Sequence, residues 1–292
     1  MSDAEIFNRN LRRLRRDRAA ADFAGHGFLV EHIGDELLHR LGLVTRIFGS
    51  ALILGAFDGR LPRALSARGI RAVAADAGFA FARASGGVQC DEDRLPFADA
   101  SFDLVMSAGV LDTVNDLPGA LALIRRVLRP DGLLLAGFVG AGSLPRLRAA
   151  TLAADSASGA VPPRLHPQID VRSAGDLLVR AGFALPVADG DRLTVGYRDP
   201  LRLARDLRGM AGGNMLQDQK PPFFGRQRLA LLCDAFAAQA GPDGRTAEIF
   251  EIVCLTGWSP GPDQPRPARR GSAAASLADI LPPPARRGGN GQ

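Results

Sequence analysis

The feature that most constrains the fold is a regular alternation of short apolar segments with helix-like segments. Segments such as Ala51-Leu52-Ile53-Leu54 are apolar throughout, as expected of buried strands. Strands separated by helices of about 10–15 residues are typical of right-handed crossovers, and therefore of a doubly wound parallel sheet. The pattern predicts strands at 51–54, 71–75, 87–90, 102–107, 133–139, 184–189, 192–197 and 248–258, and helices at 27–42, 60–68, 77–85, 116–128, 171–181, 199–210 and 226–239.

Composition divides the chain into three expected parts. Residues 1–48 form a basic, helical N-terminal extension, and residues 49–258 form the α/β domain. Segments at about 143–170 and 199–240 are expected to be insertions that cover a pocket of this domain. Residues 259–292 contain seven prolines among Ala, Ser, Gly and Arg. Such a composition cannot bury enough apolar surface to offset chain entropy, so we expect a disordered tail.

The formal net charge of +5 comes from the two ends of the chain. Residues 1–20 and 259–292 each carry +3, which leaves the body near −1. A nucleic-acid-binding face on the core is therefore not expected. Within residues 6–18, apolar side chains recur at helical spacing among arginines. This pattern predicts a basic amphipathic helix packed over the main domain, with binding to a membrane surface or a partner as the alternative.

No apolar run reaches the roughly 18–20 residues that a membrane span needs, and the start of the chain lacks the apolar core of a secretory signal. We therefore expect a cytoplasmic protein, with peripheral contact at the inner face of the membrane as the alternative. The three cysteines are widely spaced and the four histidines are scattered. Neither a disulfide framework nor a metal site is expected.

Residues 91–132 carry four motifs in a fixed order. They are Asp91-Glu92-Asp93-Arg94-Leu95-Pro96-Phe97, Ser101-Phe102-Asp103-Leu104-Val105, Val114-Asn115-Asp116-Leu117-Pro118-Gly119 and Leu128-Arg129-Pro130-Asp131-Gly132. Together they resemble the second half of a class I S-adenosylmethionine (SAM) methyltransferase domain. The resemblance implies a mostly parallel, seven-stranded, Rossmann-like sheet with helices on both faces, SAM as the cofactor, and transferase activity.

The resemblance also implies a cofactor site at the carboxyl ends of the strands, where doubly wound sheets bind ligands. Gly55 and Gly59 fall where the family has the first and last glycines of its turn, and glycine lets the backbone approach SAM closely. Ile53 replaces the family's acid, and Phe57 replaces its middle glycine. Asp58 is the candidate to compensate for the missing acid. The alternative is an ordinary tight turn between a strand and a helix.

Acidic side chains follow two further strands. Asp76 comes directly after the second strand and is expected to accept both ribose hydroxyls of SAM, with a helix N-cap as the alternative. Asp91 and Glu92 follow the third strand and are expected to face the adenine, with a solvated acidic loop as the alternative. Ser107, at the end of the fourth strand, completes the predicted cofactor-binding residues.

Further motifs narrow the resemblance to one group. Among them are Arg164-Leu165-His166-Pro167-Gln168-Ile169-Asp170, Arg205-Asp206-Leu207-Arg208-Gly209-Met210 and Phe250-Glu251-Ile252-Val253-Cys254-Leu255-Thr256-Gly257-Trp258. They are similar to bacterial relatives of the mitochondrial complex I assembly factor that hydroxylates an arginine of an Fe–S subunit. More distantly, they resemble the biotin-pathway malonyl-carrier methyltransferases. The resemblance covers about residues 5–280 and implies a protein substrate in respiratory complex I.

The sequence departs from this group after the fourth strand, where Asp112 and Thr113 stand in place of the usual His and Trp. Asp112 is the first catalytic candidate, because it can accept a proton or hydrogen-bond an arginine. His166, on a loop expected to cover the pocket, is the second, with a loop hydrogen bond as its alternative. These departures, together with those at Ile53 and Phe57, also fit a site that has lost its activity.

Three functions therefore remain open. The first is an enzyme that modifies a complex I subunit by methyl transfer or by arginine hydroxylation. The second is a non-catalytic complex I assembly protein that keeps the fold and binds a partner. The third is a methyltransferase that acts on a small molecule or an acyl carrier.

Overall fold

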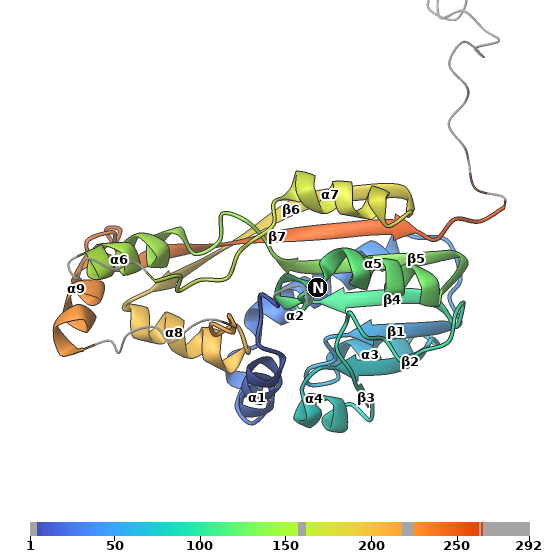
Figure 1. Ribbon diagram of the computed structural model, residues 1–292, viewed down its shortest axis with the longest axis horizontal. Coiled ribbons are helices and arrows are strands. Elements are labelled where there is room, and N and C mark those ends of the chain that lie inside the picture. The colour runs from blue at the N-terminus through green and yellow to red at the C-terminus, as the bar shows by residue number, and fades with distance from the viewer. Residues whose placement is uncertain (1–4, 157–161, 218–224, 263, 265–292) are drawn as a thin grey trace, which may run out of the picture. The chain divides into compact units, whose positions relative to one another are not determined.

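A seven-stranded sheet forms the centre of the computed structural model, which describes residues 5–156, 162–217, 225–262 and 264 (Figure 1). The strand order is β3-β2-β1-β4-β5-β7-β6, and the pairings are parallel except that β7 runs antiparallel to β5 and β6. The predicted doubly wound, mostly parallel fold is therefore confirmed. The strands are β1 (Ser50–Leu54), β2 (Arg71–Asp76), β3 (Val88–Gln89), β4 (Phe102–Ala108), β5 (Leu128–Val139), β6 (Ala184–Tyr197) and β7 (Thr246–Trp258).

Helices lie against the sheet and at its ends, close to the predicted ranges. They are α1 (Arg9–Ala20), α2 (Phe28–Gly42), α3 (Arg60–Ser66), α4 (Phe79–Ala84), α5 (Leu117–Val127), α6 (Pro145–Ser156), α7 (Val171–Arg180), α8 (Pro200–Gly209) and α9 (Arg226–Ala237). Two short 3-10 turns, η1 (Phe23–Gly25) and η2 (Leu111–Thr113), add to them.

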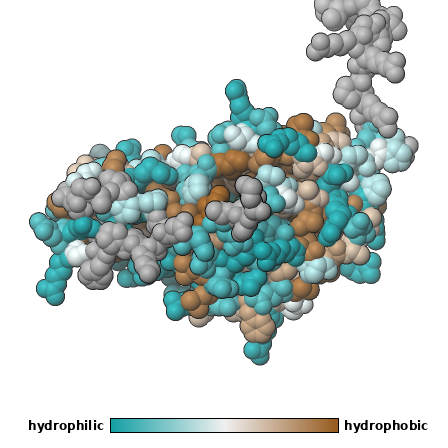
Figure 2. Space-filling model, in the orientation of Figure 1, coloured by the Kyte–Doolittle hydropathy of each residue, from teal (hydrophilic) through white to brown (hydrophobic). Residues whose placement is uncertain are grey.

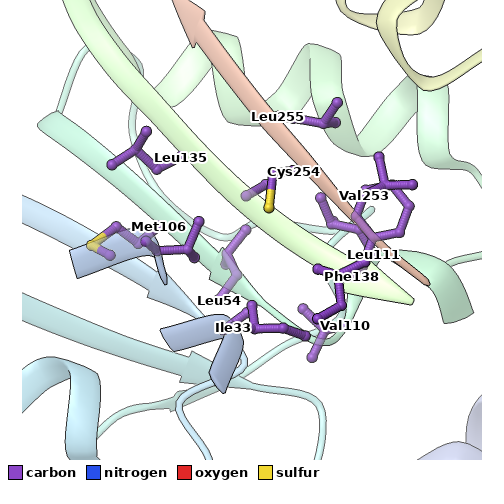
Figure 3. Packing of buried hydrophobic residues seen from close by; sticks show 14 of the residues in the cluster. Ile33, Leu54, Met106, Val110, Leu111, Leu135, Phe138, Val253, Cys254 and Leu255 are labelled. Carbon is purple, nitrogen blue, oxygen red and sulfur yellow. The ribbon is translucent and has the colours of Figure 1, made fainter. Parts of the chain in front are cut away.

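The centre of the parallel sheet is buried on both faces. All five residues of β1 are buried, and Figure 3 shows Leu54 packed among side chains of β4, β5, β7 and α2. In the ladder, Leu54 pairs with Ala75 of β2 and with Ser107 of β4, so the carboxyl ends of these strands meet at one edge. The strand order reverses between β1 and β4, and a crevice at such a switch point is where this fold binds ligands.

Strands β6 and β7 extend beyond the parallel strands, and α6, α8 and α9 gather around this extension (Figure 1). The prediction of separate strands at 184–189 and 192–197 was wrong, because the two ranges form the single strand β6. Gly190 and Asp191 resemble turn residues in the sequence, but they continue the pairing of β6 with β7. The long antiparallel partner therefore overrides the local turn signal.

Helix α1 packs with its charged face inward, the reverse of an ordinary amphipathic helix. Arg12 and Arg16 are only 3% and 4% exposed, whereas Leu14 is 44% exposed. The helix contacts both α4 and α8, as Figure 1 shows. The predicted position over the domain is therefore correct, but arginines rather than apolar side chains make the contact.

Hydrophilic residues cover most of the face drawn in Figure 2, with hydrophobic residues interspersed among them. In the part of the chain that the structure describes, no helix combines the length and the apolar composition needed to cross a membrane. Nor do three or more His, Cys, Asp or Glu side chains gather into a possible metal site within those ranges. Most of the predicted tail, residues 265–292, lies outside the described residues.

Candidate functional site

Arginines on one face of α1 meet the acids that follow β2 and β3. Their i, i+3, i+4, i+7 spacing makes the side chains leave the helix on the same side. Opposite them lie Asp76 and the acidic residues 91–93, which include the acids expected to hold the cofactor. The arginine face consists of Arg9, Arg12, Arg13 and Arg16.

The innermost pair of this contact joins Arg16 to Asp76. Arg16 Nε donates to Oδ1 at 2.7 Å and Nη2 donates to Oδ2 at 2.6 Å, which makes the pair bidentate. The Arg16 side chain is 4% exposed and that of Asp76 is 0% exposed. The amides of Gly78 and Phe57 also donate to Asp76, at 2.8 Å and 3.3 Å. Both oxygens predicted to accept ribose hydroxyls thus accept protein donors.

The acids after β3 pair with the middle of the arginine face. Arg12 Nη1 lies 2.7 Å from Glu92 Oε2, and Arg13 Nη2 lies 2.5 Å from Asp91 Oδ2. Asp91 and Glu92 are each 2% exposed, so this loop is buried rather than solvated. Burial of these charges is tolerated because each acid has a cation within hydrogen-bonding distance.

At the outer end of the arginine face, Arg9 donates to both oxygens of Asp93, at 2.6 Å and 2.7 Å. The basic helix and the acidic loop were each predicted from the sequence, but their pairing was not. Two features of the sequence could have indicated this contact. The arginines of residues 9–16 recur at helical spacing, and the acids of residues 91–93 are too many to face a single adenine. Matching charge patterns on two segments indicate a contact, although they do not give its geometry.

The turn after β1 has the predicted glycines, and the buried side chain of Phe57 fills the space at its middle position. Gly55 has a φ of +78°, and a Cβ there would lie 2.5 Å from the carbonyl oxygen that ends β4, so this position requires glycine. Phe57 is 2% exposed, and its ring stacks on Phe23 with 5.0 Å between centroids. The Arg16 guanidinium carbon lies 4.3 Å from the centroid of the Phe57 ring. An aromatic ring and an arginine thus occupy the surroundings of this turn.

The other predicted cofactor residues have varied surroundings. Asp58 is exposed, and its Oδ1 accepts the Arg60 amide at 3.0 Å. Gly59 has a φ of +80° and is the N-cap of α3. Ser107 is fully buried at the end of β4, and its Oγ has no hydrogen-bond partner among the described residues. The role of each in binding a cofactor stays a prediction.

A cavity of about 90 Å³ lies beside the innermost pair of the arginine face. Because a single water needs about 10–15 Å³ of such space, the cavity has room for several waters or for the end of one long side chain. Neither Asp76 nor Asp91 belongs to its lining. The polar groups that line it include Arg16, Asp112, Thr113, Arg164, His166, Gln168 and Asn214.

Asp112, in the turn η2 after β4, has an enclosed Oδ1 with no hydrogen-bond partner among the described residues. Burial raises the pKa of Asp112 to about 6, while Arg12 and Arg16 act in the opposite direction. The carboxylate is therefore mostly ionised at neutral pH although one oxygen is unsatisfied. Such an arrangement costs free energy and is typical of binding or catalytic positions.

His166 also lines the cavity, but its Nε2 accepts a hydrogen bond from the Met215 amide at 2.9 Å. Burial lowers the pKa of His166 to about 4, and repulsion from Arg15 lowers it further, so the ring is neutral at neutral pH. This contact corresponds to the loop hydrogen bond given as the alternative for His166. Its catalytic role stays a prediction.

Comparison with known proteins gives the class of the fold. Residues 52–136 match the family model for a methyltransferase domain. The YcgJ protein of Bacillus subtilis superposes with a TM-score of 0.54 at 15% identity, over 79% of this chain and 99% of that one. At this identity the likeness concerns the fold alone. Sheet order, the glycine turn and the strand-end acids together define a class I methyltransferase fold.

Relatives of higher identity extend over nearly the whole chain. The mitochondrial arginine-hydroxylase NDUFAF5 of Danio rerio is 32% identical over 286 residues, which are 94% of this chain and 89% of the relative. The malonyl-[acyl-carrier protein] O-methyltransferase of Laribacter hongkongensis is 30% identical over 302 residues, covering 97% and 99%. The chain therefore belongs to the SAM-dependent methyltransferase family, in the group that includes these two relatives, as the sequence predicted.

SAM is the cofactor of this family, which agrees with the prediction from the sequence. Asp76 and Asp91 have suitable chemistry for it, since carboxylates can accept hydrogen bonds from ribose hydroxyls and from an adenine amine. In the folded protein, however, Arg16 hydrogen-bonds Asp76 and Arg13 hydrogen-bonds Asp91. The Phe57 ring fills the adjoining turn, so these residues do not fit SAM as they stand.

Proposed function

We propose that this protein is a SAM-dependent enzyme that modifies an arginine side chain of a protein substrate during assembly of respiratory complex I. The observation that carries the proposal is Asp112, which lines the cavity and whose enclosed Oδ1 accepts no hydrogen bond among the described residues. A guanidinium is a cation with several N–H donors, and it would satisfy this oxygen through a charge-assisted hydrogen bond. The name of the NDUFAF5 relative, an arginine-hydroxylase, supports arginine as the residue modified.

Charges around the cavity favour a cationic group over a malonyl group. Arg16 and Arg164 line the cavity, but each already forms an ion pair with a buried acid, Asp76 and Asp155 respectively. Asp112 forms no such ion pair among the described residues, and its charge repels a carboxylate. A malonyl-carrier substrate is therefore the weaker candidate, despite the relative from Laribacter hongkongensis.

Asp112 then has two roles in this proposal. Its carboxylate binds and orients the substrate guanidinium, and it accepts a proton that substitution on a guanidinium nitrogen releases. When bound, SAM would supply an electrophilic methyl group and leave as S-adenosylhomocysteine. Hydroxylation would instead need dioxygen and two electrons from an external donor. Methyl transfer and hydroxylation add different masses to the arginine, so the product distinguishes them.

Mass spectrometry of complex I subunits from a deletion strain tests this function. The strain is complemented with the wild-type gene, with Asp112→Asn, or with Asp99→Asn as a matched control, because the Asp99 side chain is 77% exposed. We expect an arginine to carry the added methyl group or oxygen with the wild type and Asp99→Asn, and to lack it with Asp112→Asn. An unchanged set of subunit masses in the deletion strain would contradict the proposal.

A non-catalytic assembly protein is the second candidate, and the arginine face favours it, because it occupies the acids that a cofactor needs. The same strains separate the two functions. A non-catalytic protein would leave all subunit masses unchanged, while its deletion would impair complex I assembly. Asp112→Asn would then restore assembly as well as the wild type does.

A further inference from the structure

The arginine face provides an internal ligand for the chain's own cofactor site. We propose that α1 is an autoinhibitory helix: Arg16 occupies Asp76, the carboxylate expected to bind ribose, and SAM enters only after α1 has left. This inference rests on the cofactor of the family. It does not depend on which substrate the protein modifies.

The first argument is the match between Arg16 and the ribose that it would exclude. A carboxylate holds two neighbouring hydroxyls by accepting two hydrogen bonds side by side, and a guanidinium offers two N–H donors in a similar fork. Arg16 uses both, at 2.7 Å and 2.6 Å. Asp76 also accepts the amides of Gly78 and Phe57. Ribose and Arg16 therefore compete for the same two oxygens.

Phe57 supports Arg16 from a second direction. Its φ of +43° lies in the region that favours glycine, so packing has to stabilise a phenylalanine held there. The ring contacts Phe23 and Phe81, with 5.0 Å and 5.2 Å between centroids, and lies beneath the Arg16 guanidinium in a cation–π contact. The residue that departs from the family's glycine motif is thus one that packs against α1.

The surface against which α1 packs fits the helix closely. A Cβ on Gly78 would lie 2.7 Å from the Cβ of Arg16, so a larger residue would push the helix away. Asp17 accepts an amide in the first turn of α4 at 2.9 Å. Before the helix, the Asn115 side chain bonds both the amide and the carbonyl of Phe7, at 2.7 Å and 3.0 Å. Contacts at both ends therefore hold α1 in place.

Release of α1 breaks the ion pairs of its arginine face and the hydrogen bond that Asp17 accepts from α4. Separated arginines and carboxylates regain hydration, which offsets much of the lost attraction. Within α1, Leu14 is already 44% exposed and the buried apolar side chain is the small one of Ala19, so release uncovers little apolar surface. The apparent affinity for SAM then equals the intrinsic affinity multiplied by the fraction of molecules in which α1 is displaced.

Isothermal titration of the full-length protein with SAM tests the proposal. Arg16→Gln removes the bidentate pair, while Asp76 keeps its hydrogen bonds from the Gly78 and Phe57 amides. We expect this variant to bind SAM at least about tenfold more tightly than the wild type, because the open fraction rises. Arg18→Gln is the matched control. It removes the same charge from the same helix, at an exposed side chain without an acid partner among the described residues, and should leave the affinity unchanged.

Phe57→Gly tests the same inference without removing a charge. It restores the glycine of the family motif at a φ that suits glycine, and it removes the ring beneath Arg16. We expect this variant also to bind SAM more tightly than the wild type. Thermal unfolding of each variant verifies that it is folded. In the wild type, saturating SAM should increase amide hydrogen exchange in residues 9–20, because α1 is displaced.

Three outcomes would overturn the proposal. Weaker SAM binding by Arg16→Gln would make Arg16 a contact of the cofactor. Equal SAM binding by all variants would show that α1 does not compete with SAM. No SAM binding by any folded variant would show that removing Arg16 opens no site. Unchanged affinity together with product formation would reject this inference and retain the proposed function. Tighter binding by Arg16→Gln without product would do the reverse.

Discussion

Two kinds of carboxylate follow the parallel strands: three that are buried and one, Asp112, that is half-buried. Asp76, Asp91 and Glu92 each pair with an arginine of α1. Asp112, at the next strand end, keeps an oxygen without a hydrogen-bond partner among the described residues, and its pKa rises to about 6 because of burial. A cationic partner favours the charged form of a buried acid, whereas an acid without one resists ionisation.

The difference separates acids that hold the structure together from one that is available to a ligand. Arg12 lies between the two groups, since its Nη1 pairs with Glu92 while its Nε donates to Thr113, next to Asp112, at 3.1 Å. The arginine face thus forms ion pairs with Asp76, Asp91 and Glu92, although Asp91 Oδ1 and Glu92 Oε2, like Asp112 Oδ1, accept no hydrogen bond among the described residues. Within those residues, it forms no ion pair with Asp112. Substituting one residue of either group tests whether this distinction holds.

The largest expected effect is on stability, at the innermost pair. Asp76→Ala leaves the Arg16 guanidinium buried without its main partner, and we expect the free energy of unfolding to fall by about 3–5 kcal/mol. Urea denaturation of Asp76→Ala, Arg16→Ala and the double variant measures the coupling between the two residues. A coupling energy below about 0.5 kcal/mol would mean that the two changes simply add and that the pair does not hold α1.

The sequence was sufficient to predict the strands and helices around the cofactor crevice. Short, mostly apolar segments such as 51–54 and 102–107 favour buried strands, and turn residues placed the strand ends at Gly55 and Asp76 within a residue or two. Local patterns were enough here because each element buries the face that its own sequence makes apolar. At Gly190 the same reasoning failed, because pairing with β7 outweighed the turn signal.

The partners of the strand-end acids could not be predicted in the same way. Arg16 and Asp76 are sixty positions apart in the sequence, and nothing in the acid's own segment distinguishes a bond to ribose from a bond to a guanidinium. Both ligands are groups of donors that a carboxylate accepts in the same geometry. Only the folded position of α1 decides between them, and that position depends on contacts such as Gly78 with Arg16.

The second prediction concerns His166, whose pKa falls to about 4 from an ordinary value of 6.5. Between these values the unfolded chain binds a proton that the folded chain does not, so stability is lost as the pH falls through this window. At 1.36 kcal/mol per unit this loss amounts to about 3 kcal/mol. His166→Gln should remove it while costing about 1 kcal/mol at pH 7 for the lost bond to the Met215 amide. Urea midpoints at pH 7 and pH 4 measure both terms, and parallel pH profiles for variant and wild type would contradict the prediction.

Asp112 should show the opposite dependence on pH. Its folded pKa of about 6 lies above the ordinary value of 3.8, so stability falls as the pH rises through this window, by at most about 3 kcal/mol. Asp112→Asn removes the charge and should therefore be more stable than the wild type at pH 8, with little difference near pH 3.5. Thermal or urea unfolding at both pH values tests this. A variant less stable at pH 8 would show that the carboxylate has a favourable partner and belongs with the paired acids.

The smallest effect on stability is expected at the exposed edge of the arginine face. It tests whether the contribution of each arginine to stability depends on how deeply its charge is buried. The Arg13 side chain is 39% exposed, and its partner Asp91 keeps Arg9 and Arg12 within 3.5 Å and 3.7 Å. Because solvent screens a pair of this kind, Arg13→Ala should lower the free energy of unfolding by less than about 1 kcal/mol, and the difference should shrink in high salt. Urea denaturation at low and high ionic strength, beside Arg16→Ala, gives the ratio of the two effects. An equal fall in the free energy of unfolding for both variants would mean that the arginine face acts as one cooperative unit. The difference between these acids and Asp112 would then come from the arginines as a set, and not from how deeply each charge is buried.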